Sequence, residues 1–520
     1  MRERMSAVDT AWLRMDSAQN LMMIVGVYEF DGNVDFARLR DLLGTRLVTH
    51  RQFRSRVVRD ATGCYWQEVD KFDLKDHLVR SRLRGRGTVG DLKKFVGELA
   101  SQPLDETKPL WQMQLVDNYA GGQALVVRIH HCIADGIALI GVLLALTTEQ
   151  GDDETDSGTR GHRRRENGAW DARLRPLTSA AVSAIGTTGY VASRVLRGYG
   201  AMLDTPGAFA DAAVGYAGMA ARVANDAAAI ALMPNDSSTS LKGKPSGVKL
   251  VAWNEPIAVD DVKAVGKALG CSVNDVLLAC VAGAIRSYLM TRGEQVDGCE
   301  LRAMVPVNLR DPRHWKDLGN KFGLVPLLLP IGVENPIARV FEVRRRMEAL
   351  KTGYTAVVSM AMLGAAGFAP HVVQTLALEF LARKASAVMT NVPGPQQPIY
   401  LAGARVTRLM VWVPQSGDIG IGVSILSYDG GVQFGLIADQ ALCADPQQII
   451  DRFEPEFEKL VLALCMLPWG QPVDVAGAYD WLFAQPASAG RDRSKSSARM
   501  RQKDGRSQRP AVKMQGNIGG

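Results

Sequence analysis

Two adjacent histidines, His130 and His131, are the side chains of this sequence best suited to acid–base chemistry. They open the heptapeptide His-His-Cys-Ile-Ala-Asp-Gly, in which Asp135 follows four residues after His131 and Gly136 closes the motif. A neutral imidazole accepts a proton near pH 7, and no other side chain has an unperturbed pKa so suited to that task. The motif therefore indicates a general base.

The residues around the pair predict a strand, a turn and a helix. Residues 124–129 have the pattern of a short buried strand, and residues 137–146 that of an apolar helix. The histidines are then expected where a strand ends, a common place for a reactive side chain. Because adjacent strand residues point to opposite faces, the two rings are not expected to face one substrate. We assign the base to His131 and an orienting or structural role to His130.

The remainder of the chain predicts a mixed α/β fold. Further strands are expected at residues 21–30, 64–69, 248–253, 301–307, 324–331, 386–390, 419–428 and 432–438. Further helices are expected at residues 35–50, 88–100, 257–269, 272–291 and 447–464. The sequence Asp-Gly-Gly at 429–431 predicts a hairpin between the last two strands.

Length and composition divide the chain into four parts. At 520 residues it is too long for one ordinary domain. We expect an N-terminal half at 1–148, a polar linker with an Ala/Gly-rich helical connector at 149–245, a C-terminal half at 246–485 and a disordered basic tail at 486–520. Between Arg491 and Lys513 nine Lys/Arg and two Asp/Glu leave an excess of seven charges, which equals the net charge of +7 for the whole chain.

Cysteine usage and hydropathy predict a cytoplasmic protein. The seven cysteines are scattered without any C-x-x-C spacing, which favours a reducing compartment over a disulfide framework or a structural zinc site. The N-terminus has no signal-peptide pattern, and no stretch reaches the roughly 18–20 uncharged apolar residues that span a bilayer. For the connector, a core or inter-domain role and a membrane-lying segment both stay open, and for the basic tail a solvated role and attraction to a membrane surface do.

The pattern HHxxxDG resembles the active-site motif of the CoA-dependent acyltransferase superfamily, which includes chloramphenicol acetyltransferase and peptide-synthetase condensation domains. Further segments, in order and spacing, resemble one branch, the bacterial wax ester synthase/diacylglycerol acyltransferases. The resemblance covers about residues 6–470 and rests, besides the histidine motif, on Asp-Thr-Ala-Trp at 9–12, Met-Met at 22–23, Pro-Leu-Trp at 109–111, Asn-Asp at 274–275, Pro-Val-Asn-Leu-Arg at 306–310, Gly-Asn-Lys-Phe at 319–322, Asn-Val-Pro-Gly-Pro at 391–395 and Ser-Gly-Asp-Ile-Gly-Ile-Gly at 416–422.

This resemblance implies two chloramphenicol-acetyltransferase-like α/β domains with an active-site tunnel at their interface. It implies transfer of a long-chain fatty acyl group from acyl-CoA to diacylglycerol, a long-chain fatty alcohol, or both. It also implies a direct attack without an acyl-enzyme, with acyl-CoA as a substrate, so no cofactor and no metal are expected. No nucleic acid partner is expected, whereas peripheral contact with the inner membrane face or with lipid inclusions is.

The resemblance also suggests roles for the other motif residues. In the superfamily the motif aspartate generally forms a structural ion pair, for which Arg310 is the candidate partner of Asp135 by motif position. Capping of the following helix and a His–Asp dyad are the competing interpretations for Asp135. Gly136 is expected to permit a tight turn or close backbone packing.

Two residues in the second half have both a chemical and a structural interpretation. Asn274 is expected to donate to the developing oxyanion or to orient the acceptor, with helix capping as the alternative. Asp275 is expected to cap a helix or to favour its dipole.

A glycine-rich segment and a Pro-Leu-Trp segment also have more than one interpretation or a structural one. Gly417, Gly420 and Gly422 would let a ligand approach a strand closely, although a bulge or hairpin packing explains them nearly as well. The residues Pro109, Leu110 and Trp111 are expected to be architectural, because Trp and Leu bury area and Pro fixes the entry to the next strand.

Rival chemistries are disfavoured by the residues themselves. A thiolate nucleophile at Cys132 is disfavoured, because the side chains of Cys132 and the adjacent His131 are expected to point in different directions. The two histidines also lack the spacing of a recognised zinc-binding motif. Two alternative functions stay open. One is an acyltransferase that uses a carrier-protein thioester, and the other is a non-catalytic protein of lipid droplets or membrane surfaces.

Overall fold

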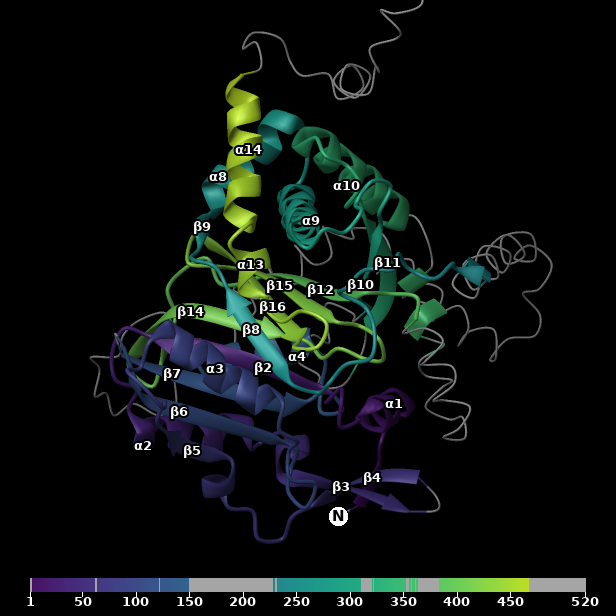
Figure 1. Cartoon of the computed structure of the whole chain (residues 1–520). Helices are drawn as coiled ribbons and strands as arrows, with labels where there is room; N and C mark the ends of the chain where they lie inside the picture. Colours follow the sequence, from purple (N-terminus) through teal and green to yellow (C-terminus); the bar gives the residue numbers. More distant parts are fainter. Residues whose placement is uncertain are drawn as a thin grey trace, which may run out of the picture. The chain divides into compact units, whose positions relative to one another are not determined.

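The fold is built on two large β-sheets, each covered by helices, and on a small third sheet (Figure 1). In the computed structural model the described residues are 2–60, 63–120, 122–148, 228–229, 232–309, 320, 322–351, 355–356, 358–360, 362 and 383–466. Most of the expected connector and all of the expected basic tail lie outside them, so the proposed domain boundaries stay predictions. The mixed α/β fold class is confirmed.

The first sheet carries the histidines and includes a strand from the second half of the chain. Its order in the described residues is β13 (Tyr400–Leu401), β14 (Ala404–Trp412), β2 (Met23–Phe30), β7 (Gly122–His130), β6 (Trp111–Tyr119) and β5 (Leu78–Ser81). β14 pairs antiparallel with β2, from Val406 opposite Phe30 to Trp412 opposite Val25. All residues of β2 are buried, which fits a near-continuous apolar strand in the middle of a sheet.

The second sheet is formed by strands of the second half. Its described strands are β11 (Phe322–Leu329), β10 (Leu301–Asn308), β12 (Ala387–Pro393), β15 (Ile421–Tyr428), β16 (Gly431–Asp439) and β8 (Lys249–Trp253), with β9 (Ile257–Ala258) beside β16. The predicted hairpin between β15 and β16 is confirmed. Asp429 and Gly430 have φ values of 46° and 76°, as a type I′ turn requires. The third sheet joins β1 (Arg2–Arg4), β4 (Gly63–Glu68) and β3 (Ser55–Asp60).

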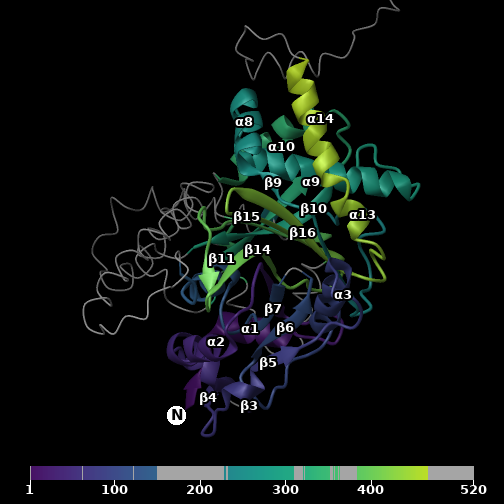
Figure 2. The same ribbon diagram turned by 90° about the vertical axis from the view of Figure 1, so that its left-hand side faces the viewer.

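The helices of the second half gather around α9 (Figures 1 and 2). They are α8 (Val259–Leu269), α9 (Val273–Thr291), α10 (Pro336–Lys351), α13 (Gln447–Ile450) and α14 (Phe453–Cys465). Among the described residues α9 alone has the length and apolar character of a membrane-crossing helix. However, 78% of its apolar window is buried inside the structure, as in a core helix.

The helices of the first half are short. They are α1 (Ala7–Met15), α2 (Phe36–Leu42), α3 (Val89–Ala100) and α4 (Gly136–Leu144), with single helical turns at Leu43–Leu47, Arg51–Arg54 and Leu74–Asp76. The helix α3 packs against β8 of the second sheet at Gly97. A Cβ there would lie 2.6 Å from the carbonyl oxygen of Lys249, so this close approach requires glycine.

Two expected helices differ in detail. The single helix expected at 35–50 is a two-turn helix that continues as one wide π-turn, followed by a 3₁₀ turn. The helix expected at 447–464 is interrupted between α13 and α14. Pro455 lies in the first turn of α14, and inside a continuous helix it would lack the N–H for the backbone ladder.

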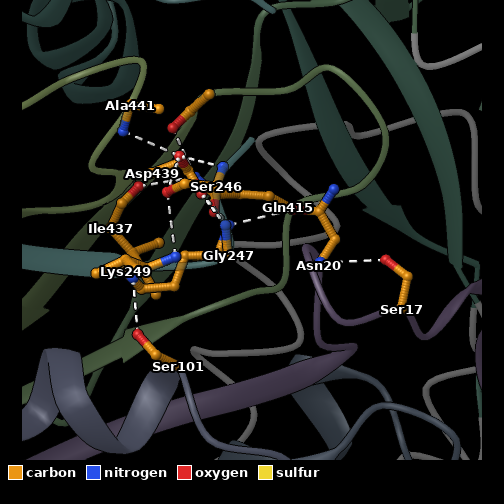
Figure 3. Close-up of polar contacts among 12 residues, drawn as sticks. Ser17, Asn20, Ser101, Ser246, Gly247, Lys249, Gln415, Ile437, Asp439 and Ala441 are labelled. Atoms are coloured by element: carbon orange, nitrogen blue, oxygen red, sulfur yellow. Dashed lines mark hydrogen bonds and ion pairs between the residues drawn. The ribbon is translucent and has the colours of Figure 1, made fainter. Parts of the chain in front are cut away.

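A buried ion pair joins β8 and β16 of the second sheet (Figure 3). The Asp439 side chain is fully buried at the end of β16, and Lys249 Nζ lies 3.5 Å from its Oδ2. Lys249 Nζ also donates to Asn20 Oδ1 at 3.2 Å, and the Lys249 backbone N–H donates to Ser101 Oγ at 2.7 Å. Asn20 and Ser101 belong to the first half, so this cluster ties that half to β8 and β16.

Hydrogen bonds to Asp439 keep its carboxylate charged. Burial opposes ionisation, but donors from Ser246 and Gly247, together with Lys249, outweigh it and hold the pKa of Asp439 below its usual value. Burial lowers the pKa of Lys249, while Asp439 acts in the opposite direction. Each charge therefore depends on the other, and removal of one leaves an uncompensated buried ion.

We expect Asp439→Ala to reduce the free energy of unfolding by about 3–5 kcal/mol, because Lys249 would remain buried without its counter-ion. Urea denaturation followed by circular dichroism measures the change. The matched control is Asp260→Ala, which removes one partner of the exposed pair with Lys263 and is expected to have almost no effect. Equal losses in the two variants would contradict the assignment.

Candidate active site

The neighbouring strand ends of the first sheet hold both histidines by their backbones. His130 ends β7, and its N–H donates to Leu110 O at 2.9 Å, just before β6. The His131 N–H donates to Met22 O at 2.7 Å, just before β2. The expected position of the pair at a strand end is confirmed. The motif segments at 22–23 and 109–111 thus supply the backbone acceptors that set this turn.

His130 and His131 point to different partners. His130 Nδ1 accepts from the N–H of Cys132 at 3.1 Å, and its Nε2 lies 3.6 Å from Asp16 Oδ2. Asp16 is itself held because its Oδ1 accepts from the N–H of Met22 at 2.6 Å. His130 is thus directed into the packing around α1, an arrangement that fits the orienting role.

The ring of His131 is hydrogen-bonded to an amide from the second half of the chain. His131 Nδ1 lies 2.9 Å from Asn320 Oδ1. Asn320 Nδ2 donates to Asp9 Oδ1 at 2.8 Å and to the carbonyl oxygen of His131 at 2.9 Å. His131 and Asn320 are 3% and 6% exposed, so these bonds are shielded from water. At Nδ1, therefore, an amide orients the imidazole.

Two aromatic side chains pack against the same ring and against each other, with the centroids of Trp12 and Phe322 5.7 Å apart. The Trp12 ring stacks on His131 with centroids 4.2 Å apart and planes 18° apart. Phe322 lies with its centroid 5.6 Å from that of His131, tilted by 45°. Because Trp12 comes from α1 and Phe322 opens β11, these ring contacts again come from both halves of the chain.

Burial dominates the electrostatics of the site. It lowers the pKa of His131 to about 4, while the Asp135 carboxylate and hydrogen bonds to backbone and Asn320 act in the opposite direction. His131 is therefore neutral at physiological pH, the state in which it accepts a proton. Burial also raises the pKa of Asp9, and hydrogen bonds from Asn320 and Ser6 counteract this.

The other residues of the heptapeptide are partly explained. Asp135 is buried and influences His131 and Asp9 electrostatically. Arg310 lies outside the described residues, so its pairing with Asp135 stays a prediction. For Gly136 the structure differs from the expectation. Its φ is not positive, and among the described residues a Cβ would make an ordinary contact, 3.7 Å from Val413, so no described contact requires glycine there.

The Asn-Asp motif at the start of α9 divides into two roles. Ser272 is the N-cap and forms a capping box with Asp275, whose Oδ2 accepts from the Ser272 N–H at 2.9 Å. Asp275 is thus a capping residue, as expected, whereas Asn274 is not. Asn274 Oδ1 accepts from Asn391 Nδ2 at 2.6 Å, which brings two motif segments together. No hydrogen bond joins Asn274 to either motif histidine within the described residues, so its oxyanion role stays a prediction.

The motif glycines lie close to the chain itself. Gly417 has a φ of 55°, and its carbonyl accepts from Asn20 Nδ2 at 2.9 Å. A Cβ at Gly420 would lie 2.1 Å from Leu241 O, and one at Gly422 would lie 2.7 Å from Ile437 Cγ2. Packing alone therefore requires glycine at 420 and 422, and their contact with substrate stays a prediction.

The Pro-Leu-Trp segment packs in the core of the first half. Leu110 and Trp111 are buried, Trp111 Nε1 donates to Phe53 O at 2.8 Å, and the Trp111 ring stacks on His77. Pro109 O accepts from the Trp111 N–H at 2.8 Å. These contacts support the architectural interpretation of the segment.

The rival interpretation of Cys132 as a nucleophile gains no support. Burial raises its pKa well above the usual value, which disfavours the thiolate. For a metal, the described residues contain no cluster of three or more His, Cys, Asp or Glu side chains placed to bind one.

Sequence reasoning did not assign roles to five residues that surround the histidines. They are Asp9, Trp12, Asp16, Asn320 and Phe322. All but Asp16 belong to segments that carried the family resemblance, at 9–12 and 319–322, and that was the available signal. No local pattern indicates that residue 320 meets residue 131.

Comparison with solved structures shows a fold shared with a wax ester synthase/diacylglycerol acyltransferase and with a condensation domain. The structure is similar to a wax ester synthase/diacylglycerol acyltransferase from Marinobacter aquaeolei VT8, with a TM-score of 0.61 and 22% identity, covering 89% of this chain and 100% of that one. It is also similar to the first condensation domain of the calcium-dependent antibiotic synthetase, with a TM-score of 0.53 and 14% identity, covering 90% and 97%.

The sequence narrows the class to one family. Residues 5–277 match the family model of the wax ester synthase/diacylglycerol acyltransferase catalytic domain, and residues 318–461 match that of the WS/DGAT C-terminal domain. A probable diacylglycerol O-acyltransferase of Mycobacterium tuberculosis H37Rv, tgs1, is 29% identical over 404 residues, which cover 76% of this chain and 81% of that one. The chain belongs to the wax ester synthase/diacylglycerol acyltransferase family and is an acyltransferase.

We expect the acid limb of kcat/KM to have its midpoint near pH 4. Since the pKa of His131 is lowered from 6.5 to about 4, the neutral base is present at every pH above that value. The rate with acyl-CoA, measured at a series of pH values, should stay level from about pH 8 down to about pH 5.5.

Circular dichroism at each pH is the control. Between pH 6.5 and 4, His131 is protonated in the unfolded chain but not in the folded one. Folding stability therefore falls as the pH drops through this range. A limb centred at 6.5 in folded protein would contradict the buried, neutral base.

Proposed function

We propose that this acyltransferase moves a long-chain fatty acyl group from acyl-CoA to the hydroxyl of diacylglycerol or a long-chain alcohol, with His131 as general base. The observation that carries the proposal is the neutral, buried imidazole whose Nδ1 is occupied by Asn320. Nε2 is then the nitrogen left for the acceptor hydroxyl. Family membership supplies the substrate classes.

The proposed reaction has two steps without a covalent enzyme intermediate. His131 Nε2 takes the hydroxyl proton as the acceptor oxygen bonds to the thioester carbonyl carbon. The resulting tetrahedral intermediate then collapses, the C–S bond breaks, and the imidazolium returns the proton to the departing CoA sulfur. The products are one ester and free CoA, so neither a metal nor a bound cofactor is needed.

The developing oxyanion needs a hydrogen-bond donor. Asn274 remains our candidate, because its Oδ1 already accepts from Asn391 and its Nδ2 hydrogens are therefore directed to other acceptors. The capping box of Ser272 and Asp275 holds this end of α9 in place. The charge of Asp135 favours the imidazolium.

We further propose a cytoplasmic location with peripheral attachment to the inner membrane face or to lipid inclusions. Diacylglycerol and long-chain alcohols partition into lipid, so the acceptor has to be taken from a lipid phase. Exposed apolar side chains at the end of α14 support this attachment, with Leu462 63% and Met466 86% exposed.

We expect purified protein to form labelled ester from radiolabelled palmitoyl-CoA, offered dioleoylglycerol and hexadecanol in separate reactions. His131→Ala should lower the rate by about 10²–10⁴-fold, the usual contribution of a general base. His50→Ala is the matched control, since that half-buried histidine lies outside the site. If His131→Ala forms as much product as the wild type, His131 is not the general base. Product only from a palmitoylated carrier protein would favour the carrier-fed alternative, and lipid binding without any ester would favour a non-catalytic role.

We expect the double substitution Leu462→Ser/Met466→Ser to weaken sedimentation with vesicles of phosphatidylglycerol and dioleoylglycerol. The loss follows from removing apolar area that enters the lipid. Met290→Ser is the matched control, because Met290 is 53% exposed on another helix. A contact at the end of α14 would be contradicted if the double variant and Met290→Ser weakened sedimentation equally, or if neither variant weakened it.

A further inference from the structure

Three side chains from distant parts of the sequence form one buried polar chain. Asp9 lies on α1, His131 follows β7, and Asn320 lies just before β11. The links are Asp9 Oδ1 to Asn320 Nδ2 at 2.8 Å and Asn320 Oδ1 to His131 Nδ1 at 2.9 Å. None of the three residues is more than 9% exposed, so water does not compete for these bonds.

The orientation of the Asn320 amide is determined by its neighbours. Its Nδ2 lies against two oxygens, Asp9 Oδ1 and the carbonyl of His131. The carbonyl only accepts hydrogen bonds, and so does an ionised carboxylate, which means that the amide nitrogen, with two hydrogens, must face them. The Asn320 oxygen is then the atom that faces His131 Nδ1.

This orientation determines the tautomer of the base. An amide oxygen has no hydrogen to donate, so His131 Nδ1 has to carry one. A neutral imidazole has a single ring hydrogen, and its Nε2 is therefore left with a free lone pair. The other tautomer would place two lone pairs against each other at 2.9 Å and present an N–H, not a base, at Nε2.

We propose that Asn320 is a positioning residue that sets the His131 tautomer, and that Asp9 is a positioning residue that orients Asn320. The inference rests on the proposed function, in which His131 Nε2 removes the acceptor proton. Asp9 and His131 belong to the first half and Asn320 to the second, so the base is prepared only where the two halves meet.

Substitutions at position 320 separate this arrangement from a simple His–carboxylate pair. Asn320→Asp would place a carboxylate oxygen against Asp9 and the His131 carbonyl, with no hydrogen to share. Both Asn320→Asp and Asn320→Ala are expected to lower kcat by about 10²–10⁴-fold, with KM for palmitoyl-CoA changed by less than about threefold. Full activity of Asn320→Asp would overturn the proposal.

A reciprocal exchange tests the link to Asp9. In Asp9→Asn/Asn320→Asp the amide at position 9 again donates to its neighbour, and a carboxylate at position 320 still accepts from His131 Nδ1. Only the bond to the His131 carbonyl is lost. The double variant is expected to be about tenfold more active than Asn320→Asp alone. Activity no higher than that of Asn320→Asp would overturn the role of Asp9.

The tautomer itself is measured without turnover, by nitrogen NMR of full-length protein labelled with [¹⁵N]histidine. His131→Gln identifies the resonances of His131. We expect an Nδ1–H tautomer in the wild type and its loss in Asn320→Ala. An Nε2–H tautomer in the wild type, or an unchanged Nδ1–H signal in Asn320→Ala, would overturn the proposal. Because this readout needs no substrate, it separates failure of the proposal from failure of the proposed function.

Asn254→Ala controls for loss of structure. Asn254 is a buried asparagine at the end of β8, and its Oδ1 accepts from the Phe434 N–H at 2.7 Å, away from the histidines. We expect this change to lower Tm but to leave the His131 tautomer and kcat of the folded protein unchanged. If Asn254→Ala alters the tautomer as much as Asn320→Ala, position 320 has no special role.

Discussion

The antiparallel pairing of β14 with β2 is the constraint on which the rest of the structure depends. β7, which ends at His130, is the next strand after β2 in the same sheet, so the histidines lie two strands from a strand of the second half. The buried Lys249–Asp439 pair, with its bonds to Asn20 and Ser101, holds the second sheet to the same first half. With the halves joined in this way, Asn320 and Phe322 can reach a histidine that precedes them by 189 and 191 residues in the chain.

Burial of the base has two opposing consequences. It keeps His131 neutral, and it also makes the imidazole a weaker base than one in water, because an imidazolium is costly in such surroundings. The carboxylate of Asp135 acts against that cost. A charge placed in advance needs no rearrangement when the proton arrives, so it stabilises the imidazolium formed during reaction without a cost of reorganisation.

Local features of the site were predictable from sequence, and its long-range contacts were not. The apolar run at 124–129 and the capping residues at the start of α9 carry their own local signals, and both appear in the structure. Asn320 carries no such signal, because an asparagine in a connection favours many local roles and its partner is distant. The strand β14 was missed for a related reason, since its partner lies in the other half. At Gly420 and Gly422 the sequence indicated a close approach but not by which group. The structure shows that Leu241 and Ile437 of the same chain make this approach.

The late position of β14 has a consequence for synthesis on the ribosome. Thr407 on β14 bonds to Glu29 on β2, a residue made 378 positions earlier. Until β14 emerges, β2 is an open edge, with unpaired backbone groups and apolar side chains that invite pairing with other chains. Pairing between such distant segments also forms slowly, because the chain loses the entropy of the long intervening loop before any stabilising contact forms. The nascent first half is therefore the stage at which aggregation competes most with folding, and substitutions that weaken β14 are expected to reduce the yield of folded protein before they alter catalysis.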